Sequence, residues 1–228
     1  MSTKPSFRFL VQDIKQIAPD TRLFQFDFGL TPMEYYPGQF VVVTLPQSDP
    51  RVTAAITLAS SPLRRQSFEL AIVRTGNFGT RFYDSVQIGQ IIEMSVAQGK
   101  FHPELSDPRP ILLIAHDYCT TGIRAIWQYH ADSSLPRPVT FLHGQRDGQS
   151  ALFADEFTST SAPNRRYLPV SLPPAPATLS SETIASALSA QPGCVVFLVG
   201  EGPDVAATRH HLEQLGISRD RLHLERWS

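Results

Sequence analysis

The sequence predicts two domains: a six-stranded antiparallel β-barrel over residues 1–106, then an α/β domain with a Rossmann-like parallel sheet over residues 107–228. Two observations predict this fold class. The N-terminal part holds short runs of β-branched and aromatic residues separated by turn residues at short intervals, which is typical of barrels and sandwiches. After a proline-bearing break at 105–110, short apolar runs alternate with segments of helical periodicity, which is typical of a parallel sheet covered by helices.

Six segments of the N-terminal domain are expected to be strands. They cover residues 7–14, 23–28, 39–45, 55–58, 68–73 and 91–96. The turn Pro37-Gly38 introduces the third of them, because proline and glycine favour tight turns. A single short helix is expected over 80–85, between the fifth and sixth strands.

The C-terminal domain is expected to alternate strands and helices. The strands are expected over 111–115, 139–143, 167–172, 194–199 and 222–224, and the helices over 121–130, 150–157, 181–190 and 203–215. Ser180 or Ser181 would cap the third helix, Gly216 would end the fourth, and the proline-rich segment 173–178 would be a loop. Ligands of such sheets bind beyond the carboxyl ends of the strands, which points to 116–122, 144–147 and 200–203.

Composition limits the classes of function. Of 228 residues, 42% are apolar and 18% are charged, and the formal net charge is -1, so nothing predicts nucleic-acid binding. No apolar run is long enough for a membrane span, and the start MSTKPSFRFL lacks the apolar core of a signal peptide. The two cysteines and the absence of a CxxC pair indicate a cytoplasmic protein without a disulfide framework, an iron–sulfur cluster or another metal site.

An ordered series of short motifs carries a family resemblance. In chain order they are Pro37-Gly38-Gln39-Phe40, Thr57-Leu58-Ala59-Ser60-Ser61-Pro62, Gly79-Thr80, Gly99-Lys100-Phe101, Gly144-Gln145-Arg146, Gly200-Glu201-Gly202-Pro203 and Leu222-His-Leu-Glu-Arg-Trp227. In this order and spacing the chain resembles the ferredoxin–NADP reductase family of flavoproteins, which includes NAD(P)H:flavin reductases of similar length. The resemblance extends from about Phe7 to Trp227.

The resemblance implies an oxidoreductase in which the barrel binds FAD or FMN and the α/β domain takes NAD(P)H as co-substrate. Hydride would pass from the nicotinamide to the flavin, and the electrons would go on to free flavin or to a separate redox protein. On the flavin side, Thr57 falls beside flavin N5, with Leu58, Ala59 and Ser60 along the isoalloxazine edge. Gly79 and Thr80 would begin a helix facing the pyrophosphate, since helix amino ends suit phosphates.

On the nicotinamide side, the resemblance places the loop 116–122 and its Asp117, Thr121 and Gly122 at the nucleotide. Gly200 falls at the same edge of the sheet, and Glu225 and Trp227 would border the nicotinamide. Thr57, Glu225 and Trp227 are therefore the candidate catalytic residues. For Arg146 two readings stay open: it binds a ribose phosphate of the cofactor, or it pairs with Asp147 or a nearby acid.

The chain departs from the family pattern on both sides. Ala54 and Ile56 stand where the family has an arginine for the flavin phosphate and an aromatic residue; Arg74 is one possible substitute, as are Arg51, Arg64, Arg65 and Arg81. The glycine-rich turn of the pattern GGxGxxP reads His116-Asp117-Tyr118-Cys119-Thr120-Thr121-Gly122. Two alternatives follow: a non-catalytic scaffold or regulatory subunit that has lost normal cofactor binding, or a binding module for another nucleotide. A metal or nucleophile site at His116, Asp117 and Cys119 is disfavoured, because such residues within one loop seldom form a site alone.

Overall fold

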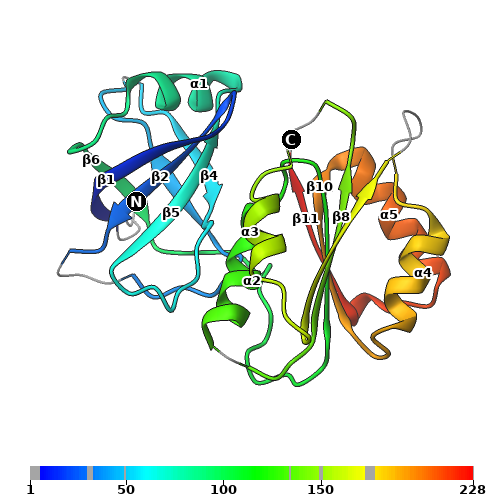
Figure 1. Ribbon diagram of the computed structural model, residues 1–228. Helices are drawn as coiled ribbons and strands as arrows, with labels where there is room; N and C mark the ends of the chain where they lie inside the picture. The colour runs from blue at the N-terminus through cyan, green and yellow to red at the C-terminus, as the bar shows by residue number, and fades with distance from the viewer. Residues whose placement is uncertain are drawn as a thin grey trace. The chain divides into compact units, whose positions relative to one another are not determined.

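The computed structural model describes residues 6–29, 33–48, 50–133, 135–148, 151–172 and 178–227, and the chain divides into two compact units (Figure 1). One unit, called the barrel unit below, comprises residues 1–102 together with 124–132. The other, the α/β unit, comprises residues 103–123 and 133–228. Among the residues described, no helix has both the length and the apolar character that crossing a membrane requires. The predicted domain boundary at 106/107 stays a prediction.

The barrel unit holds six strands in one antiparallel sheet, which confirms the predicted class. The strands are β1 (Ser6–Ala18), β2 (Thr21–Asp27), β3 (Phe40–Thr44), β4 (Thr53–Thr57), β5 (Ser67–Val73) and β6 (Ile91–Ser95), in the spatial order β4-β3-β6-β1-β2-β5. The two outer strands meet where Leu58 bridges Leu70 and the Ala59 N–H donates to the Glu69 carbonyl at 2.8 Å. This contact closes the sheet into a barrel, so that its edges are paired.

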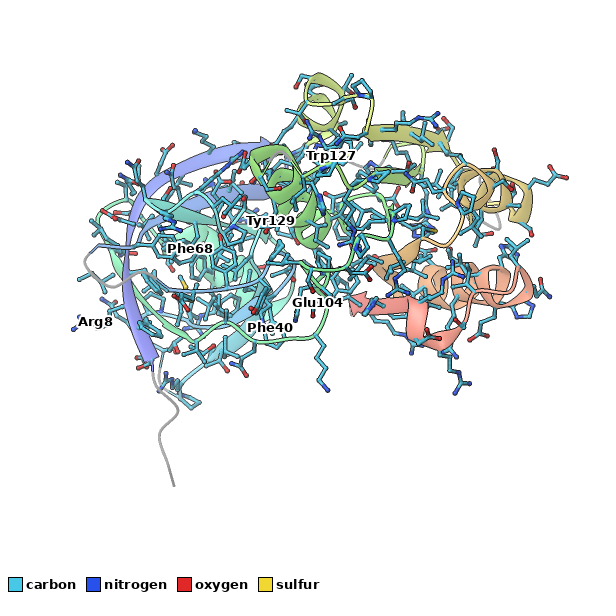
Figure 2. All side chains as sticks on the ribbon, turned by 90° about the horizontal axis from the view of Figure 1, so that it is seen from below. Arg8, Phe40, Phe68, Glu104, Trp127 and Tyr129 are labelled. Atoms are coloured by element: carbon cyan, nitrogen blue, oxygen red, sulfur yellow. The ribbon has the colours of Figure 1, made fainter. Side chains whose placement is uncertain are left out.

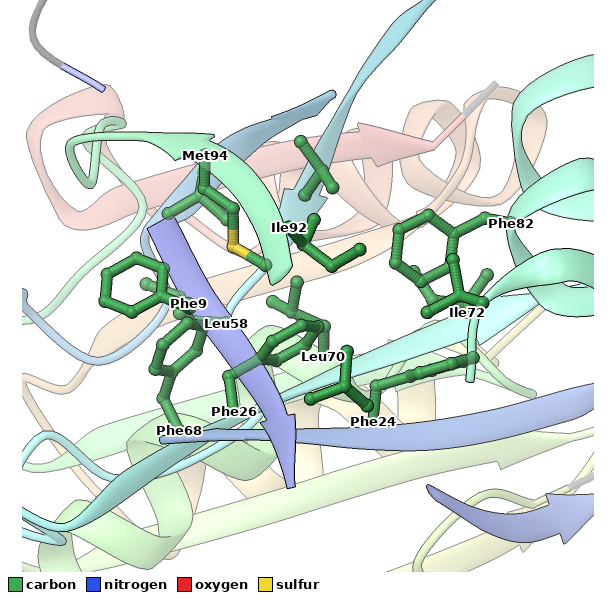
Figure 3. Close-up of a cluster of buried hydrophobic side chains, with 14 of the residues drawn as sticks. Phe9, Phe24, Phe26, Leu58, Phe68, Leu70, Ile72, Phe82, Ile92 and Met94 are labelled. Atoms are coloured by element: carbon green, nitrogen blue, oxygen red, sulfur yellow. The ribbon is translucent and has the colours of Figure 1, made fainter. Parts of the chain in front are cut away.

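Aromatic side chains fill the interior of the barrel. Phe9, Phe26 and Phe68 are at most 2% exposed, and the ring centroids of Phe9 and Phe68 lie 4.8 Å apart in an edge-to-face arrangement (Figure 3). Figure 2 shows Phe68 within the unit and Arg8 at its periphery, which matches their burial. The alternation of buried and exposed residues along β1 therefore places one face of the strand in the core.

The helix between β5 and β6 begins earlier than predicted. Helix α1 spans Gly76–Ser85 after Thr75, so the expected start at Thr80 is wrong and the Gly79-Thr80 pair lies inside the helix. The physical reason is that Phe78 and Phe82, one helical turn apart, stack at 5.4 Å and extend the apolar face by one turn. Gly79 permits close packing of α1 on β5, because a Cβ there would overlap the Val73 carbonyl oxygen.

The α/β unit holds a five-stranded parallel sheet, also as predicted. Its strands are β7 (Ile111–His116), β8 (Val139–Gln145), β9 (Arg165–Ser171), β10 (Val195–Glu201) and β11 (Leu222–Trp227), in the order β11-β10-β7-β8-β9. Helix α3 (Ala154–Ser159) lies on one face, and α4 (Ser181–Ser189) and α5 (Gly202–Gln214) lie on the other (Figure 1). Strands β7 and β10 are apolar because they are buried on both faces.

The helix ends follow the predicted signals in part. The Ser180 hydroxyl accepts a hydrogen bond from the Thr183 N–H at 3.1 Å, which confirms the cap of α4. Helix α3 begins at Ala154, later than the expected start at position 150. Position 150 and residues 173–177 of the expected proline-rich loop lie outside the described residues. Helix α2 (Thr121–Ser133) forms as expected, and its residues 124–132 pack with the barrel unit.

Candidate functional site

The loop that follows β4 is the candidate flavin edge of the barrel unit. Thr57 is the last residue of β4, opposite Phe40 on β3, and is 9% exposed. The N–H groups of Leu58 and Ala59 donate to the carbonyls of Gln39 and Glu69 at 2.9 and 2.8 Å. Leu58, Ala59 and Ser60 are at most 1% exposed. The backbone of this loop is therefore fixed by the barrel itself.

Helix α2 fixes the same loop from its other side. The Arg124 Nη1 donates to the Ala59 carbonyl at 2.8 Å and to the Glu69 carboxylate at 2.6 Å. The Gln128 side-chain oxygen accepts the Ser61 N–H at 3.0 Å. Sequence reasoning missed this pair of contacts. A usable signal existed, since Arg124 and Gln128 are polar residues four apart in an otherwise apolar helical segment.

The candidate arginines that could replace the arginine absent at position 54 differ in whether they already form ion pairs. Arg51 pairs with Glu93, Arg64 with Asp132, and Arg74 with both carboxylate oxygens of Asp84. Within the described part of the chain, Arg81 has no ion pair. It lines a cavity of about 390 Å³ together with Thr80, Leu45 and Gln47. Arg81 is therefore the better candidate for a phosphate than Arg74, whose guanidinium is already bound to a carboxylate.

In the α/β unit, the loop after β7 is organised by Asp117. This residue adopts a left-handed backbone with φ of 48°, at a position where the resembled family has glycine. Its carboxylate accepts the Arg146 backbone N–H at 2.7 Å and the Arg146 Nη1 at 2.6 Å. Arg146 also forms an ion pair through Nη2 with Asp204 on α5. The sequence left two interpretations of Arg146 open: a contact to a cofactor ribose phosphate, or an ion pair with a nearby acid. In the structure Arg146 forms ion pairs with Asp117 and Asp204.

Two buried histidines lie beneath this loop. The His143 Nε2 lies 2.7 Å from the Asp117 carbonyl and its Nδ1 lies 2.9 Å from the Tyr167 hydroxyl. Burial lowers the pKa of His143 to about 4, and burial also lowers the pKa of His116 below its usual value. Burial raises the pKa of the Cys119 thiol. Both imidazoles are therefore neutral near pH 7 and the thiol stays protonated, so this cluster offers no thiolate nucleophile.

The rim of the loop carries aromatic and acidic groups. The Tyr118 hydroxyl donates to the Glu201 carboxylate at 2.6 Å, and its ring centroid lies 6.1 Å from that of Trp227. The Trp227 Nε1 donates to the Glu225 carboxylate at 3.3 Å. Gly200 lies close beneath, since a Cβ there would stand 3.1 Å from His116 Nδ1. The carboxyl ends of β7, β10 and β11 thus bring Asp117, Gly200, Glu225 and Trp227 to one edge, as the parallel sheet predicts.

The amino end of α2 follows the loop that is expected to meet the phosphates of a nucleotide. Thr121 is the first residue of this helix and is 2% exposed, and its hydroxyl oxygen has no hydrogen-bond partner among the residues described. Buried hydroxyls are normally hydrogen-bonded, so such an atom indicates a missing partner. The free N–H groups and dipole of a helix amino end attract anions. The role of Thr121 and Gly122 at a pyrophosphate stays a prediction.

Comparison with known proteins agrees with this geometry. Residues 8–102 match the family of oxidoreductase FAD-binding domains. The ferredoxin reductase component of 3-ketosteroid-9-alpha-monooxygenase from Mycobacterium tuberculosis H37Rv is 27% identical over 201 residues, covering 85% of this chain and 55% of the relative. Ferredoxin–NADP reductase B from Sorangium cellulosum is 24% identical over 211 residues, covering 83% of this chain and 84% of the relative. The chain spans about half the length of the first of these relatives.

Solved structures share the two-unit fold. Phthalate dioxygenase reductase superposes with a TM-score of 0.82 at 18% identity, covering 97% of this chain and 68% of that one. The Amycolatopsis cytochrome P450 reductase GcoB superposes with a TM-score of 0.80 at 22% identity, covering 98% and 71%. At these identities the likeness shows the fold. Residues 8–102 thus resemble an oxidoreductase FAD-binding domain, and most of the chain is similar to ferredoxin reductases in sequence and in fold.

Proposed function

We propose that this protein is an NAD(P)H-dependent flavoprotein reductase. It takes a hydride from NAD(P)H onto bound FAD, and the resulting two electrons leave for an acceptor. The observation that carries the proposal is the match of residues 8–102 to an oxidoreductase FAD-binding domain. The loop after β4 in this domain is buried and is held by hydrogen bonds at Ala59 and Ser61. A bound flavin supplies the redox chemistry, and the protein supplies binding, orientation and exclusion of water.

On the flavin side, Thr57 ends β4 beside the fixed loop and serves as the residue next to the reactive flavin edge. Arg81 and Thr80 take the phosphate end in the cavity beside α1, where they replace the arginine that is absent at Ala54. A guanidinium that is not already paired is the strongest partner that a protein side chain offers a phosphate. On this proposal, Arg81 supplies the positive charge that the family has at the position of Ala54.

On the nicotinamide side, Thr121 and Gly122 at the amino end of α2 bind the pyrophosphate. Glu225 and Trp227, linked by the hydrogen bond from the indole, border the nicotinamide. Tyr118 adds a second ring at this rim. An aromatic rim of this kind shields the nicotinamide from water, which suits hydride transfer because a hydride donor must be kept from competing reactions.

The acceptor is proposed to be a separate redox protein or free flavin. The 228 residues hold two cysteines, both buried, so they do not supply the four ligands that an iron–sulfur cluster usually takes. A curated relative is named as the ferredoxin reductase component of a monooxygenase, and this name supports a protein acceptor. The non-catalytic alternative gains no such support. The curated relatives are named as ferredoxin reductases, flavohemoproteins and a sulfhydrogenase subunit.

Calorimetric titration of the flavin-free protein with FAD and FMN tests the proposal. We expect saturable FAD binding with one site per chain, and binding of a nicotinamide nucleotide by the same preparation. A Thr57→Val variant should retain FAD binding but slow the reduction of the flavin, and Thr57→Ser should restore it. A protein that binds neither FAD nor FMN would overturn the proposal in favour of a scaffold.

A further inference from the structure

Three consecutive residues of the loop after β4 are each held by a polar side chain from elsewhere in the barrel unit. We call residues 58–61 the flavin loop. The hydrogen bonds join the Ala59 carbonyl to Arg124 at 2.8 Å, the Ser60 carbonyl to the Tyr35 hydroxyl at 3.2 Å, and the Ser61 N–H to Gln128 at 3.0 Å. Each of the three side-chain partners is at most 8% exposed. The flavin loop is therefore held by side chains outside it at every position from 59 to 61.

These contacts exceed what a connection between two strands requires. Backbone hydrogen bonds of the barrel already fix the N–H groups of Leu58 and Ala59. Burying a guanidinium, a phenol and a carboxamide in addition is costly, because each of these polar groups loses its water. A binding site gains from such contacts, since a loop that already has its bound conformation loses no further entropy when the ligand arrives. The flavin loop therefore has the character of a binding edge rather than of a simple turn.

Arg124 differs from Tyr35 and Gln128 because it carries a charge. Its Nη1 lies 2.6 Å from the Glu69 carboxylate, and the exposed side-chain fractions are 7% for Arg124 and 17% for Glu69. The Glu69 backbone binds the flavin loop as well: its carbonyl accepts the Ala59 N–H at 2.8 Å, and its N–H donates to the Ser60 hydroxyl at 2.9 Å. The two side chains therefore form a largely buried, neutral ion pair directly against the flavin loop.

A second ion pair at the same helix is exposed and serves as a comparison. Asp132 lies about two helical turns after Arg124 on α2, and it pairs with Arg64, just beyond the flavin loop. The exposed side-chain fractions of this pair are 45% for Arg64 and 27% for Asp132. Water and salt screen exposed charges, whereas largely buried charges interact more strongly. Of the two pairs, the one between Arg124 and Glu69 therefore has the larger electrostatic effect on a ligand at the flavin loop.

Reduction of a flavin places negative charge at its binding site. A hydride from NAD(P)H brings two electrons and one proton, so the neutral oxidised flavin becomes an anion and the nicotinamide becomes a cation. A largely buried carboxylate without a counter-ion would oppose the new negative charge, because like charges repel strongly where water is scarce. Arg124 cancels the charge of Glu69 at the flavin loop and so removes this repulsion.

We propose that Arg124 is a positioning residue of the flavin site: it holds the Ala59 carbonyl in place and neutralises Glu69, so that the bound flavin can take up the negative charge of a hydride. This inference rests on the proposed function, since it places the flavin along the flavin loop. Tyr35 and Gln128 hold the same loop without a charge. The effect of charge on the flavin therefore comes from Arg124 and Glu69, and the effect of loop geometry comes from Arg124, Tyr35 and Gln128 together.

Midpoint potentials of FAD bound to the whole chain test the effect of charge, measured against a reference dye at about pH 8, which keeps an unpaired carboxylate ionised. In Arg124→Met, reduced FAD should bind at least about tenfold more weakly relative to oxidised FAD, which corresponds to a potential roughly 30 mV more negative for a two-electron couple. Glu69→Gln should raise the potential, and the double variant should return it close to that of the parent protein. The matched control Asp132→Asn breaks the exposed pair with Arg64 and should leave the potential unchanged. Shifts of the same sign in Arg124→Met and Glu69→Gln, or no shift in either, would overturn the proposal.

Two further variants keep the proposal testable if Arg124→Met folds poorly. Arg124→Lys retains the positive charge beside Glu69 and should keep the potential close to that of the parent protein, whereas a shift as large as that expected for Arg124→Met would contradict the effect of charge. Gln128→Leu removes the acceptor of the Ser61 N–H without changing the charge. It should raise the Kd for FAD several-fold and leave the potential of the bound flavin unchanged, and an unchanged Kd would contradict the effect of loop geometry.

The parent protein separates failure of this inference from failure of the proposed function. If it binds FAD and NAD(P)H reduces that FAD, while the Arg124 and Glu69 variants keep its potential, the inference is refuted and the proposed function stands. If the parent protein binds no FAD, the proposed function is refuted and this inference with it.

Discussion

The Nη1 atom of Arg124 lies 2.6 Å from the carboxylate of Glu69 and 2.8 Å from the carbonyl of Ala59. Arg124 is on α2 and its side chain is 7% exposed, while that of Glu69 on β5 is 17% exposed. This one guanidinium therefore connects a helix, a strand and the loop proposed to carry the flavin edge. The integrity of that loop depends on a contact between residues 55 positions apart in sequence.

Removing the Arg124 charge should destabilise the protein strongly. Arg124→Met leaves Glu69 largely buried without its cation, and we expect the free energy of unfolding to fall by about 3 kcal/mol. Chemical denaturation measures this change. The matched control is Arg51→Met, which breaks the exposed pair with Glu93 and should cost less than about 1 kcal/mol. Equal costs for the two variants would contradict the role given to Arg124.

Loss of the Arg81 guanidinium should weaken FAD binding. If Arg81 is the phosphate-binding residue, Arg81→Ala should raise the Kd for FAD about ten- to a hundredfold, since a charge-assisted hydrogen bond contributes roughly 1.5–3 kcal/mol. Quenching of flavin fluorescence on titration gives the Kd. Arg51→Ala removes an arginine that is already paired with Glu93 and should change the Kd little. If the two variants bind FAD alike, the phosphate lies elsewhere.

Acid should destabilise the fold through His143. Its folded-state pKa of about 4 lies below the ordinary value of 6.5, because burial disfavours the charged imidazole. Between these pH values the unfolded chain binds the proton and the folded protein does not. The free energy of unfolding should therefore fall as the pH is lowered through this window, by up to about 1.4 kcal/mol per pH unit from this side chain.

Denaturation midpoints at several pH values between 4 and 7 (a range set by the pKa of about 4 and the ordinary 6.5) measure that slope. His143→Gln should make the dependence of the unfolding free energy on pH shallower. The control is His210→Gln, which removes an exposed imidazole and should change this dependence less. His116, whose pKa burial also lowers, contributes in the same direction and leaves part of the slope in place. An identical slope in the parent protein and in His143→Gln would argue against a neutral buried His143.

A methyl group at Gly79 should disrupt the packing of α1 on β5. The Cβ of Gly79→Ala would overlap the Val73 carbonyl oxygen, which belongs to the backbone and cannot rotate away. We expect a loss of about 1–3 kcal/mol in the free energy of unfolding, the usual cost of overpacking. Gly202→Ala has open space around the added Cβ and is the control. A neutral Gly79→Ala would mean that α1 is not held against β5.

Most of the strands could be predicted because each carries a local signal. Ile111–His116 and Val195–Glu201 are near-continuous apolar runs, and a run of this kind is what a strand buried on both faces requires. The start of α1 could not be predicted in this way. Gly79 and Thr80 were expected to open the helix, and only the packing of Phe78 and Phe82 shows that the helix begins one turn earlier.

The site residues were predictable only where the parallel sheet brings strand ends together. Asp117, Gly200 and Trp227 follow that rule, since they stand at the carboxyl ends of neighbouring strands. The partners of Arg146 did not follow from sequence, because Asp204 belongs to a helix two strands later in the chain, while the adjacent Asp147 was the simpler expectation. Long-range ion pairs leave no periodic pattern, so their partners become visible only in three dimensions.

Anaerobic reduction of the FAD-loaded protein by a nicotinamide nucleotide is the decisive test of the proposed reductase activity. We expect the purified protein, supplied with FAD and freed of excess, to keep the visible absorption of an oxidised flavin. This absorption should bleach when NADH or NADPH is added without oxygen. A protein that keeps no flavin absorption would contradict the proposed function. So would a bound flavin that dithionite bleaches while neither NADH nor NADPH does.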